Sequence, residues 1–312
     1  MDKILQKIAN LLILNLQNCE NNGLIKGKMG IAVFLYHYSR YASQPVYNKQ
    51  ADDLLDEIFA MLEMIVTPSL SDGVAGIGLG LNHLIENHFI ATNEKRDELF
   101  KDVDVKLSQD YSGQFTFDTK TNFPVFSAGF YALSRIKTGS RSIQKNKLVS
   151  SLLEGLDLIY TINKLTLNPM FINSAIHFLI GVYDCGMYKQ KAERTMKKFL
   201  SFVLATFPEM KYHFSDVEIM QNTLSSTKLC PALTGEILSR IKQLDISPSN
   251  TDDMDVVIKD LQQYTLYPNL DKTSLSQFSV EEYIDKQITD SFFPDLSSLT
   301  YIGLNIIGVK LC

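Results

Sequence analysis

The apolar residues of this chain recur mainly at helical spacing. Near the N-terminus, apolar side chains return every three or four positions at Ile4, Ile8, Leu11, Leu12 and Leu16. This spacing predicts an amphipathic first helix rather than a strand or a secretion signal, because a signal needs a longer apolar run. The same periodicity predicts amphipathic helices over residues 51–65, 148–159 and 192–204.

A second kind of segment is apolar over most of its circumference. Residues 33–38, 77–85 and 178–183 show this pattern. Such a helix is expected to be covered on all sides by neighbouring helices. The chain is therefore predicted to be all-helical, with covered inner helices and amphipathic outer ones.

One glycine motif recurs at the start of the inner segments. Gly27 and Gly30 precede the first, and Gly73 and Gly76 precede the second. Weaker copies occur around Gly129, at residues 173–180, and around Gly235 and Gly303. Glycine lets neighbouring backbones approach closely, so we interpret these residues as packing residues. A phosphate-binding loop is the alternative, but it would follow a strand and occur once.

The copies define a repeat of an outer helix, a loop, a glycine turn and an inner helix. Successive copies lie about 46 to 66 residues apart. Such pairs stack into an open solenoid or close into a ring. The all-round apolar inner helices favour an α/α toroid of about six to seven helical-hairpin repeats. We expect one domain over residues 1–312, with a shortened or divergent region near 245–290.

Composition narrows the functional classes. The chain has 312 residues, 45% of them hydrophobic, and a formal net charge of −5. Without a sustained basic block, nucleic acid is not an expected partner. The four cysteines, Cys19, Cys185, Cys230 and Cys312, are widely spaced, which predicts reduced thiols in the cytoplasm. No apolar run reaches the ~18 residues of a membrane span.

The glycine-and-helix pattern at residues 23–36 and 69–84 resembles the lanthionine synthetase C-like (lantibiotic cyclase) family. The resemblance extends at low similarity over nearly the whole chain. It implies an α/α barrel of seven inner helices inside seven outer ones. Catalytic members of the family bind one zinc ion through two cysteines and a histidine. The zinc lowers the pKa of a substrate thiol, which adds to a dehydrated residue to close a thioether ring.

Most of the residues that the family uses are replaced here. Cys230 matches the first zinc cysteine, but no Cys, His or Gly lies between Gly235 and the last repeat. The positions of the family's pocket aspartate, histidine and arginine hold Asn122, Ile172 and Ser226. If Cys230 is aligned instead to the family's Cys-His-Gly motif, Pro231 replaces the histidine. The resemblance thus predicts Cys230 as a vestigial single ligand and no zinc cofactor.

Three histidines remain candidates. His37 and His83 each lie seven residues after a motif glycine, and His177 lies on the fourth inner helix. They could face the cavity or pack with satisfied hydrogen bonds, and both readings stay open. The candidate cavity residues are therefore His37, His83, Asn122, His177 and Ser226. A metal site formed by histidines with Cys230 is a further alternative.

The expected function is a pseudoenzyme of ribosomal peptide modification. It would bind a precursor peptide or a peptide-modifying enzyme. One alternative is an active thioether-forming cyclase with atypical zinc ligands. Another is a sugar-active toroid that uses a carboxylate pair such as Asp52-Asp53, Asp56-Glu57 or Glu281-Glu282, although the chain has no Trp for sugar stacking.

Overall fold

The computed structural model describes most of the chain as helix, turn or loop. The described residues are 2–91, 96–110, 124–139, 143–159, 169–207, 212, 214–244, 280–289 and 294–311. No strand occurs among them. The chain divides into two compact units, one formed by Met1–Arg96 with Asn250–Cys312 and the other by Asp97–Ser249.

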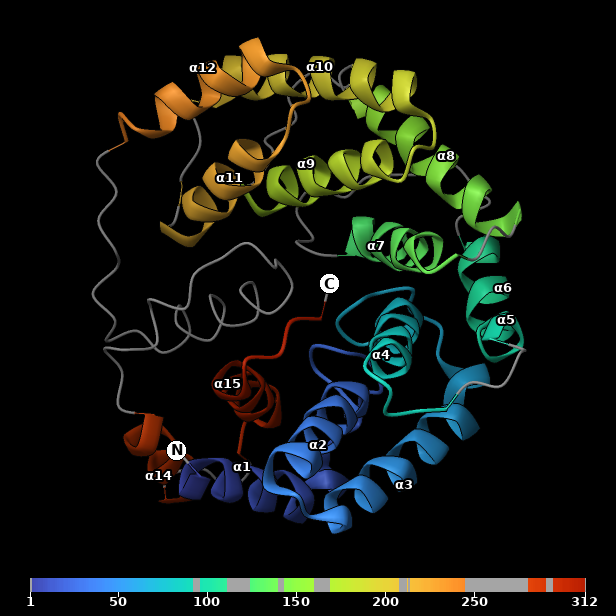
Figure 1. Cartoon of the computed structure of the whole chain (residues 1–312), viewed down its shortest axis with the longest axis vertical. Helices are drawn as coiled ribbons and strands as arrows, with labels where there is room; N and C mark the ends of the chain where they lie inside the picture. The colour runs from blue at the N-terminus through green and yellow to red at the C-terminus, as the bar shows by residue number, and fades with distance from the viewer. Residues whose placement is uncertain are drawn as a thin grey trace. The chain divides into compact units, whose positions relative to one another are not determined.

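The first unit joins helices from both ends of the chain (Figure 1). Its central helix α2 (Lys28–Ala42) packs between α15 (Leu296–Ile307) and α4 (Val74–Glu86). A second layer contains α14 (Val280–Thr289), α1 (Asp2–Leu14) and α3 (Pro45–Met61), of which α1 packs against α2 and α15, and α3 packs against α2. The short 3-10 turns η1 (Leu16–Asn18) and η2 (Leu62–Met64) follow α1 and α3.

The second unit is also built from two layers of helices. One layer contains α7 (Pro124–Lys137), α9 (Pro169–Asp184) and α11 (Phe214–Ser226). The other contains α6 (Lys101–Asp110), α8 (Ile143–Ile159), α10 (Lys189–Thr206) and α12 (Pro231–Ile241). The one-turn helix α5 (Arg96–Leu99) precedes α6. Each of α7, α9 and α11 packs against the helix that follows it in sequence, so the repeating element is a helical hairpin (Figure 1).

Burial confirms the two predicted kinds of helix. In α4, twelve of thirteen residues are buried, whereas in α10 only seven of eighteen are. The first predicted helix is α1, which buries Leu5, Ile8, Ala9 and Leu12. Predicted boundaries were short at the N-terminal ends, since α3 begins at Pro45 and α8 at Ile143.

The motif glycines lie where two loops touch. Gly27 and Gly73 are the N-caps of α2 and α4, and the backbone N–H of Leu24 donates to the Leu70 carbonyl at 3.2 Å. A Cβ on Gly76 would clash with that carbonyl oxygen and lie 2.7 Å from the Leu24 nitrogen. Glycine therefore permits the two loops to meet backbone to backbone.

Of three further motif glycines, Gly30 faces backbone, whereas Gly129 and Gly303 face side chains. A Cβ on Gly30 would clash with the Leu24 carbonyl oxygen, and one on Gly303 would clash with the Phe34 ring. On Gly129 it would lie 2.8 Å from the Phe178 ring. These positions also require close helix packing.

The copy around Gly235 does not begin an inner helix, so that prediction is wrong. A Cβ on Gly235 would meet no described heavy atom within 4 Å. The helix that carries it, α12, buries only Thr234, Ile237 and Ile241 and packs against α10 and α11. The inner helix of this hairpin is α11, which the glycine pattern did not mark.

Two further predictions, the divergent region near 245–290 and the lack of a membrane span, can be compared with the structure only over the described residues. Of the divergent region near 245–290, residues 245–279 lie outside the described residues, and the rest includes α14. Searching the described helices for a stretch that is long and apolar enough to cross a membrane finds none.

Candidate functional site

The packing of α2 against α4 joins two of the predicted histidines. His37 and His83 lie in the C-terminal halves of these helices, and their Nε2 atoms are 2.9 Å apart. This is hydrogen-bond distance, so one Nε2 donates a proton and the other must be unprotonated to accept it. The equal spacing of the histidines from Gly30 and Gly76 is the sequence signal for this pairing.

Three further residues enclose the histidine pair. Asn87 donates from Nδ2 to the His83 carbonyl oxygen at 2.9 Å, and Arg40 donates to the Asn87 carbonyl oxygen at 2.7 Å. The Phe89 ring packs edge-on against His37, with centroids 4.6 Å apart. Arg40 also lies over the Phe89 ring, 3.6 Å from its centroid. Sequence reasoning missed Arg40, Asn87 and Phe89, because only the loop after α4 brings them together.

Burial makes the pair weakly basic. It lowers the pKa of His83 to about 4. It lowers the pKa of His37 to about 3, with smaller contributions from His83 and Arg40. Both imidazoles are therefore neutral at pH 7. Neither has the pKa near 7 that a general base needs at that pH. The geometry supports a structural hydrogen bond between the buried ring of His83 and the half-buried ring of His37.

The other predicted cavity residues are dispersed. His177 lies on α9 with the Phe130 ring edge-on at 5.6 Å, and burial lowers its pKa to about 4. Ser226 ends α11 and donates to the Thr223 carbonyl oxygen at 2.8 Å. Asn122 lies outside the described residues. Ile172, at the family's histidine position, is fully buried in α9.

The carboxylate pairs considered for sugar chemistry lie on exposed faces. Asp52, Asp53, Asp56 and Glu57 are exposed on α3, and Glu57 accepts from Lys28 at 2.6 Å. Glu281 and Glu282 are exposed on α14. This placement is that of solvated helix faces.

Cys230 lies in the second unit, at the N-cap of α12. Its backbone is left-handed, with φ 48° and ψ 55°, and Pro231 follows at the first helical position. Its Sγ is 3.7 Å from the Glu193 carbonyl oxygen. Burial raises the pKa of the Cys230 thiol, the Glu193 carboxylate adds to this rise, and Lys197 opposes it.

Cys230 borders a groove between α10 and α12 with a volume of about 470 Å³. The groove is lined by Gln190, Glu193, Arg194, Lys197, Cys230, Pro231, Ala232 and Leu233. The sequence did not predict it, because Cys230 was assigned to the start of an inner helix. The available signal was the cluster of five basic residues in α10.

The donor set around Cys230 does not fit zinc. Structural and catalytic zinc sites use three or four protein ligands. Of the described residues that line the groove, Glu193 alone joins Cys230 as a potential ligand. Across the described part of the chain, no group of three or more His, Cys, Asp or Glu side chains is arranged to hold a metal ion.

Comparison with known proteins relates the fold of the chain to that of a solved cyclase. No family model matches the sequence, and no curated protein matches it. Among solved structures, "Nisin cyclase" superposes with a TM-score of 0.58 and 12% sequence identity, covering 98% of this chain and 94% of that chain. The chain therefore has the all-helical fold of nisin cyclase, an α/α toroid.

Proposed function

We propose that this protein is a lanthionine synthetase C-like pseudoenzyme of ribosomal peptide modification. It binds a precursor peptide or a peptide-modifying enzyme in the cytoplasm and has no zinc-dependent cyclase activity. The proposed role in peptide modification is supported by the fold, which matches that of nisin cyclase over nearly the whole chain. A fold by itself does not carry an activity, so the chemistry depends on the residues.

The proposed loss of cyclase activity rests on the surroundings of Cys230. Cys230 is the N-cap of the outer-layer helix α12, and its thiol faces the backbone carbonyl of Glu193. Among the described residues that line the groove, Glu193 is the one other potential ligand, whereas zinc sites use three or four protein ligands. Ile172, which has no proton to exchange, is buried where the family places a histidine.

Metal content tests this proposal directly. Untagged protein purified from zinc-supplemented cultures is expected to contain much less than one zinc per chain by mass spectrometry. In parallel, a dehydrated peptide that contains cysteine is incubated with the protein, and the remaining free thiols are counted after alkylation. Nisin cyclase serves as the positive control for both measurements.

The result that would contradict the proposal is one zinc per chain together with loss of free peptide thiols. That result would favour the active cyclase with atypical ligands. The substitution Cys230→Ala would then show whether Cys230 is one of those ligands.

Binding is tested with a peptide from the genetic neighbourhood. If a neighbouring gene encodes a short Ser/Thr/Cys-rich peptide, that peptide is expected to bind in isothermal titration calorimetry without added metal. Binding that appears only after zinc is added would contradict a metal-independent role.

A further inference from the structure

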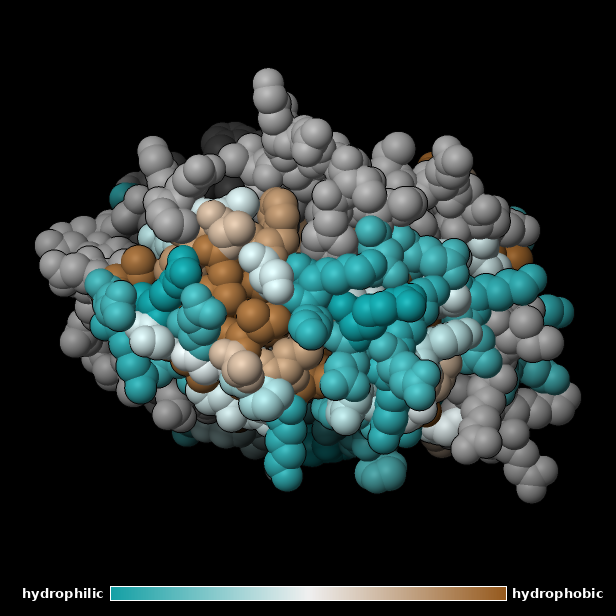
Figure 2. Space-filling view, turned by 90° about the horizontal axis from the view of Figure 1, so that it is seen from above, coloured by the Kyte–Doolittle hydropathy of each residue, from teal (hydrophilic) through white to brown (hydrophobic). Residues whose placement is uncertain are grey.

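The groove between α10 and α12 combines two kinds of surface. Its α12 side is apolar and consists of Pro231, Ala232 and Leu233 together with Cys230. Its α10 side carries two basic residues, Arg194 and Lys197, one acidic residue, Glu193, and the neutral Gln190. Figure 2, which views the molecule from the side of these helices, shows an apolar area directly beside a hydrophilic one. We propose that this groove docks a peptide segment that carries both acidic and apolar side chains.

The charge of α10 supports an acidic partner. This helix carries five basic side chains, at Lys189, Lys191, Arg194, Lys197 and Lys198, and one acidic side chain, Glu193. The whole chain has a net charge of −5, so this face is opposite in sign to the rest. Complementary charge raises the association rate and selects the partner.

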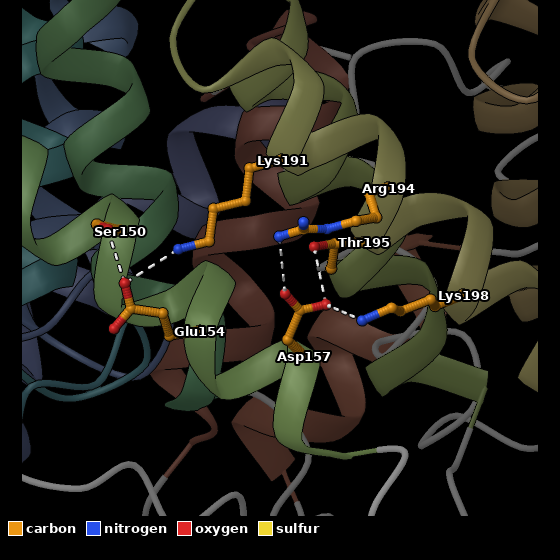
Figure 3. Close-up of polar contacts among 7 residues, drawn as sticks. All are labelled: Ser150, Glu154, Asp157, Lys191, Arg194, Thr195 and Lys198. Atoms are coloured by element: carbon orange, nitrogen blue, oxygen red, sulfur yellow. Dashed lines mark hydrogen bonds and ion pairs between the residues drawn. The ribbon is translucent and has the colours of Figure 1, made fainter.

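Some of these basic side chains form ion pairs within the fold. On α8, Glu154 accepts from Lys191 at 3.0 Å, and Asp157 lies 3.2 Å from Lys198 and 3.9 Å from Arg194 (Figure 3). With these two carboxylates and Glu193 counted, the five cations still outnumber the acids by two. Within the described part of the chain Lys197 forms no ion pair, and it lines the groove.

The arrangement of charges explains why Lys197 is available. Glu154 and Asp157 hold Lys191 and Lys198 toward α8, and Arg194, 3.9 Å from Asp157, also lines the groove (Figure 3). Lys197 lies on the side of α10 that faces α12, near enough to Cys230 to influence its pKa. Lys197 is therefore the groove cation that is available to pair with a carboxylate of a bound peptide.

The apolar side favours a peptide over nucleic acid. The volume of about 470 Å³ lies in the usual range for ligand sites, roughly 300–1,000 Å³. The described lining residues include no aromatic ring on which a base could stack. An excess of two positive charges is also small beside the roughly six to ten phosphate contacts of nucleic-acid binders.

The test uses an array of synthetic 12-residue peptides and the full-length protein. Acidic–apolar peptides with varied order of Glu, Asp, Leu and Val are compared with basic–apolar and acidic–polar sets. We expect saturable binding of acidic–apolar members alone, measured by fluorescence anisotropy of the strongest binders. We also expect this binding to weaken as salt is raised.

Three variants locate the binding. Lys197→Glu is expected to weaken it at least tenfold, and Leu233→Ser several-fold, with the helical circular-dichroism signal unchanged. The matched control is Lys49→Glu, an exposed charge reversal on α3 of the other unit, which is expected to change affinity less than twofold.

Cysteine alkylation gives a second readout that needs no variant. Bound peptide is expected to slow maleimide modification of Cys230 but not of Cys185, both quantified by mass spectrometry. Equal affinity of Lys197→Glu and wild type, or unchanged Cys230 labelling, would overturn the proposal. So would an oligonucleotide that binds more tightly than every peptide and depends on Lys197. None of these results depends on whether the protein binds zinc.

Discussion

At Gly76, one hydrogen atom in place of a methyl group determines whether two loops can meet. The Leu70 carbonyl oxygen and the Leu24 nitrogen occupy the space where a side chain would begin. Both are backbone atoms that cannot rotate away. At Gly235, by contrast, the same added carbon would meet no described atom within 4 Å.

These two glycines form a matched pair for stability measurements. Gly76→Ala is expected to lower the free energy of unfolding by about 2–4 kcal/mol, because the backbone must shift. Gly235→Ala is expected to raise it by about 0.5–1 kcal/mol, because alanine favours an exposed helix interior. Urea denaturation followed by circular dichroism measures both, and destabilisation by Gly235→Ala would contradict the exposed position of α12.

The histidine pair makes stability depend on pH. The pKa values of His37 and His83 are lowered in the folded protein to about 3 and about 4. The unfolded chain, with ordinary histidine pKa values near 6.5, therefore binds more protons below that pH. Stability from the pair is complete above about pH 6.5 and is lost as the pH falls toward the folded values.

The slope of unfolding free energy against pH tests this linkage. Between pH 6 and 4.5, His37→Leu/His83→Leu is expected to reduce the slope by about 2–2.5 kcal/mol per pH unit. His88→Asn is the control, since His88 is exposed with φ 57° and asparagine tolerates that conformation. A slope equal to wild type in the double variant would mean that the pair is not neutral when folded.

Between helices, exposed polar contacts contribute less to the stability of the fold than apolar packing does. Asp157 on α8 is 20% exposed and interacts with Arg194, Lys198 and the Thr195 hydroxyl of α10 (Figure 3). Glu154, one turn earlier, is 65% exposed and pairs with Lys191. Exposed ion pairs contribute little because water and salt screen them.

Substitutions at these two positions should therefore differ. Asp157→Asn is expected to destabilise the protein by about 1 kcal/mol, and Glu154→Gln by less than about 0.5 kcal/mol. Repeating the urea titrations in 1 M NaCl should shrink both effects. A larger cost for Glu154→Gln than for Asp157→Asn would show that exposure does not rank these ion pairs.

The sequence predicted the inner helices α2, α4 and α9 well because their apolar residues leave no polar face, whereas the inner helix α11 was not predicted. Residues 77–85 alone identify α4, and the corresponding histidine positions suggested a related role for His37 and His83. The prediction from the sequence was wrong at α12, because a small-residue motif cannot show which layer a helix occupies. The groove beside Cys230 was unpredictable for the same reason, since it requires α12 to lie against α10.

For the whole molecule, a single domain over residues 1–312 stays a prediction. We expect one cooperative heat-absorption peak in calorimetry. Two separated peaks would mean that the two compact units are independent domains, and the unit that melts first could be assigned from the hydrogen exchange of α2 and α9.

The first unit depends on the last helix of the chain. The Tyr301 hydroxyl donates to the Leu24 carbonyl oxygen at 3.2 Å, and Gly303 lies against Phe34. The helix also packs against α1, so deleting residues 294–311 is expected to expose the surfaces of α1 and α2 that α15 covers. Hydrogen exchange should then show greater loss of protection in α1 and α2 than in α9, and unchanged exchange in α2 would contradict this dependence.

This union of the chain's two ends also constrains synthesis on the ribosome. Helices α1 to α4 emerge early, whereas α15, which completes their packing, emerges about 200 residues later. At about 5–20 residues per second, the nascent chain must keep the apolar face of α2 from aggregating for roughly 10–40 seconds. Chaperone supply during translation should therefore limit the yield of this protein more than its final stability does.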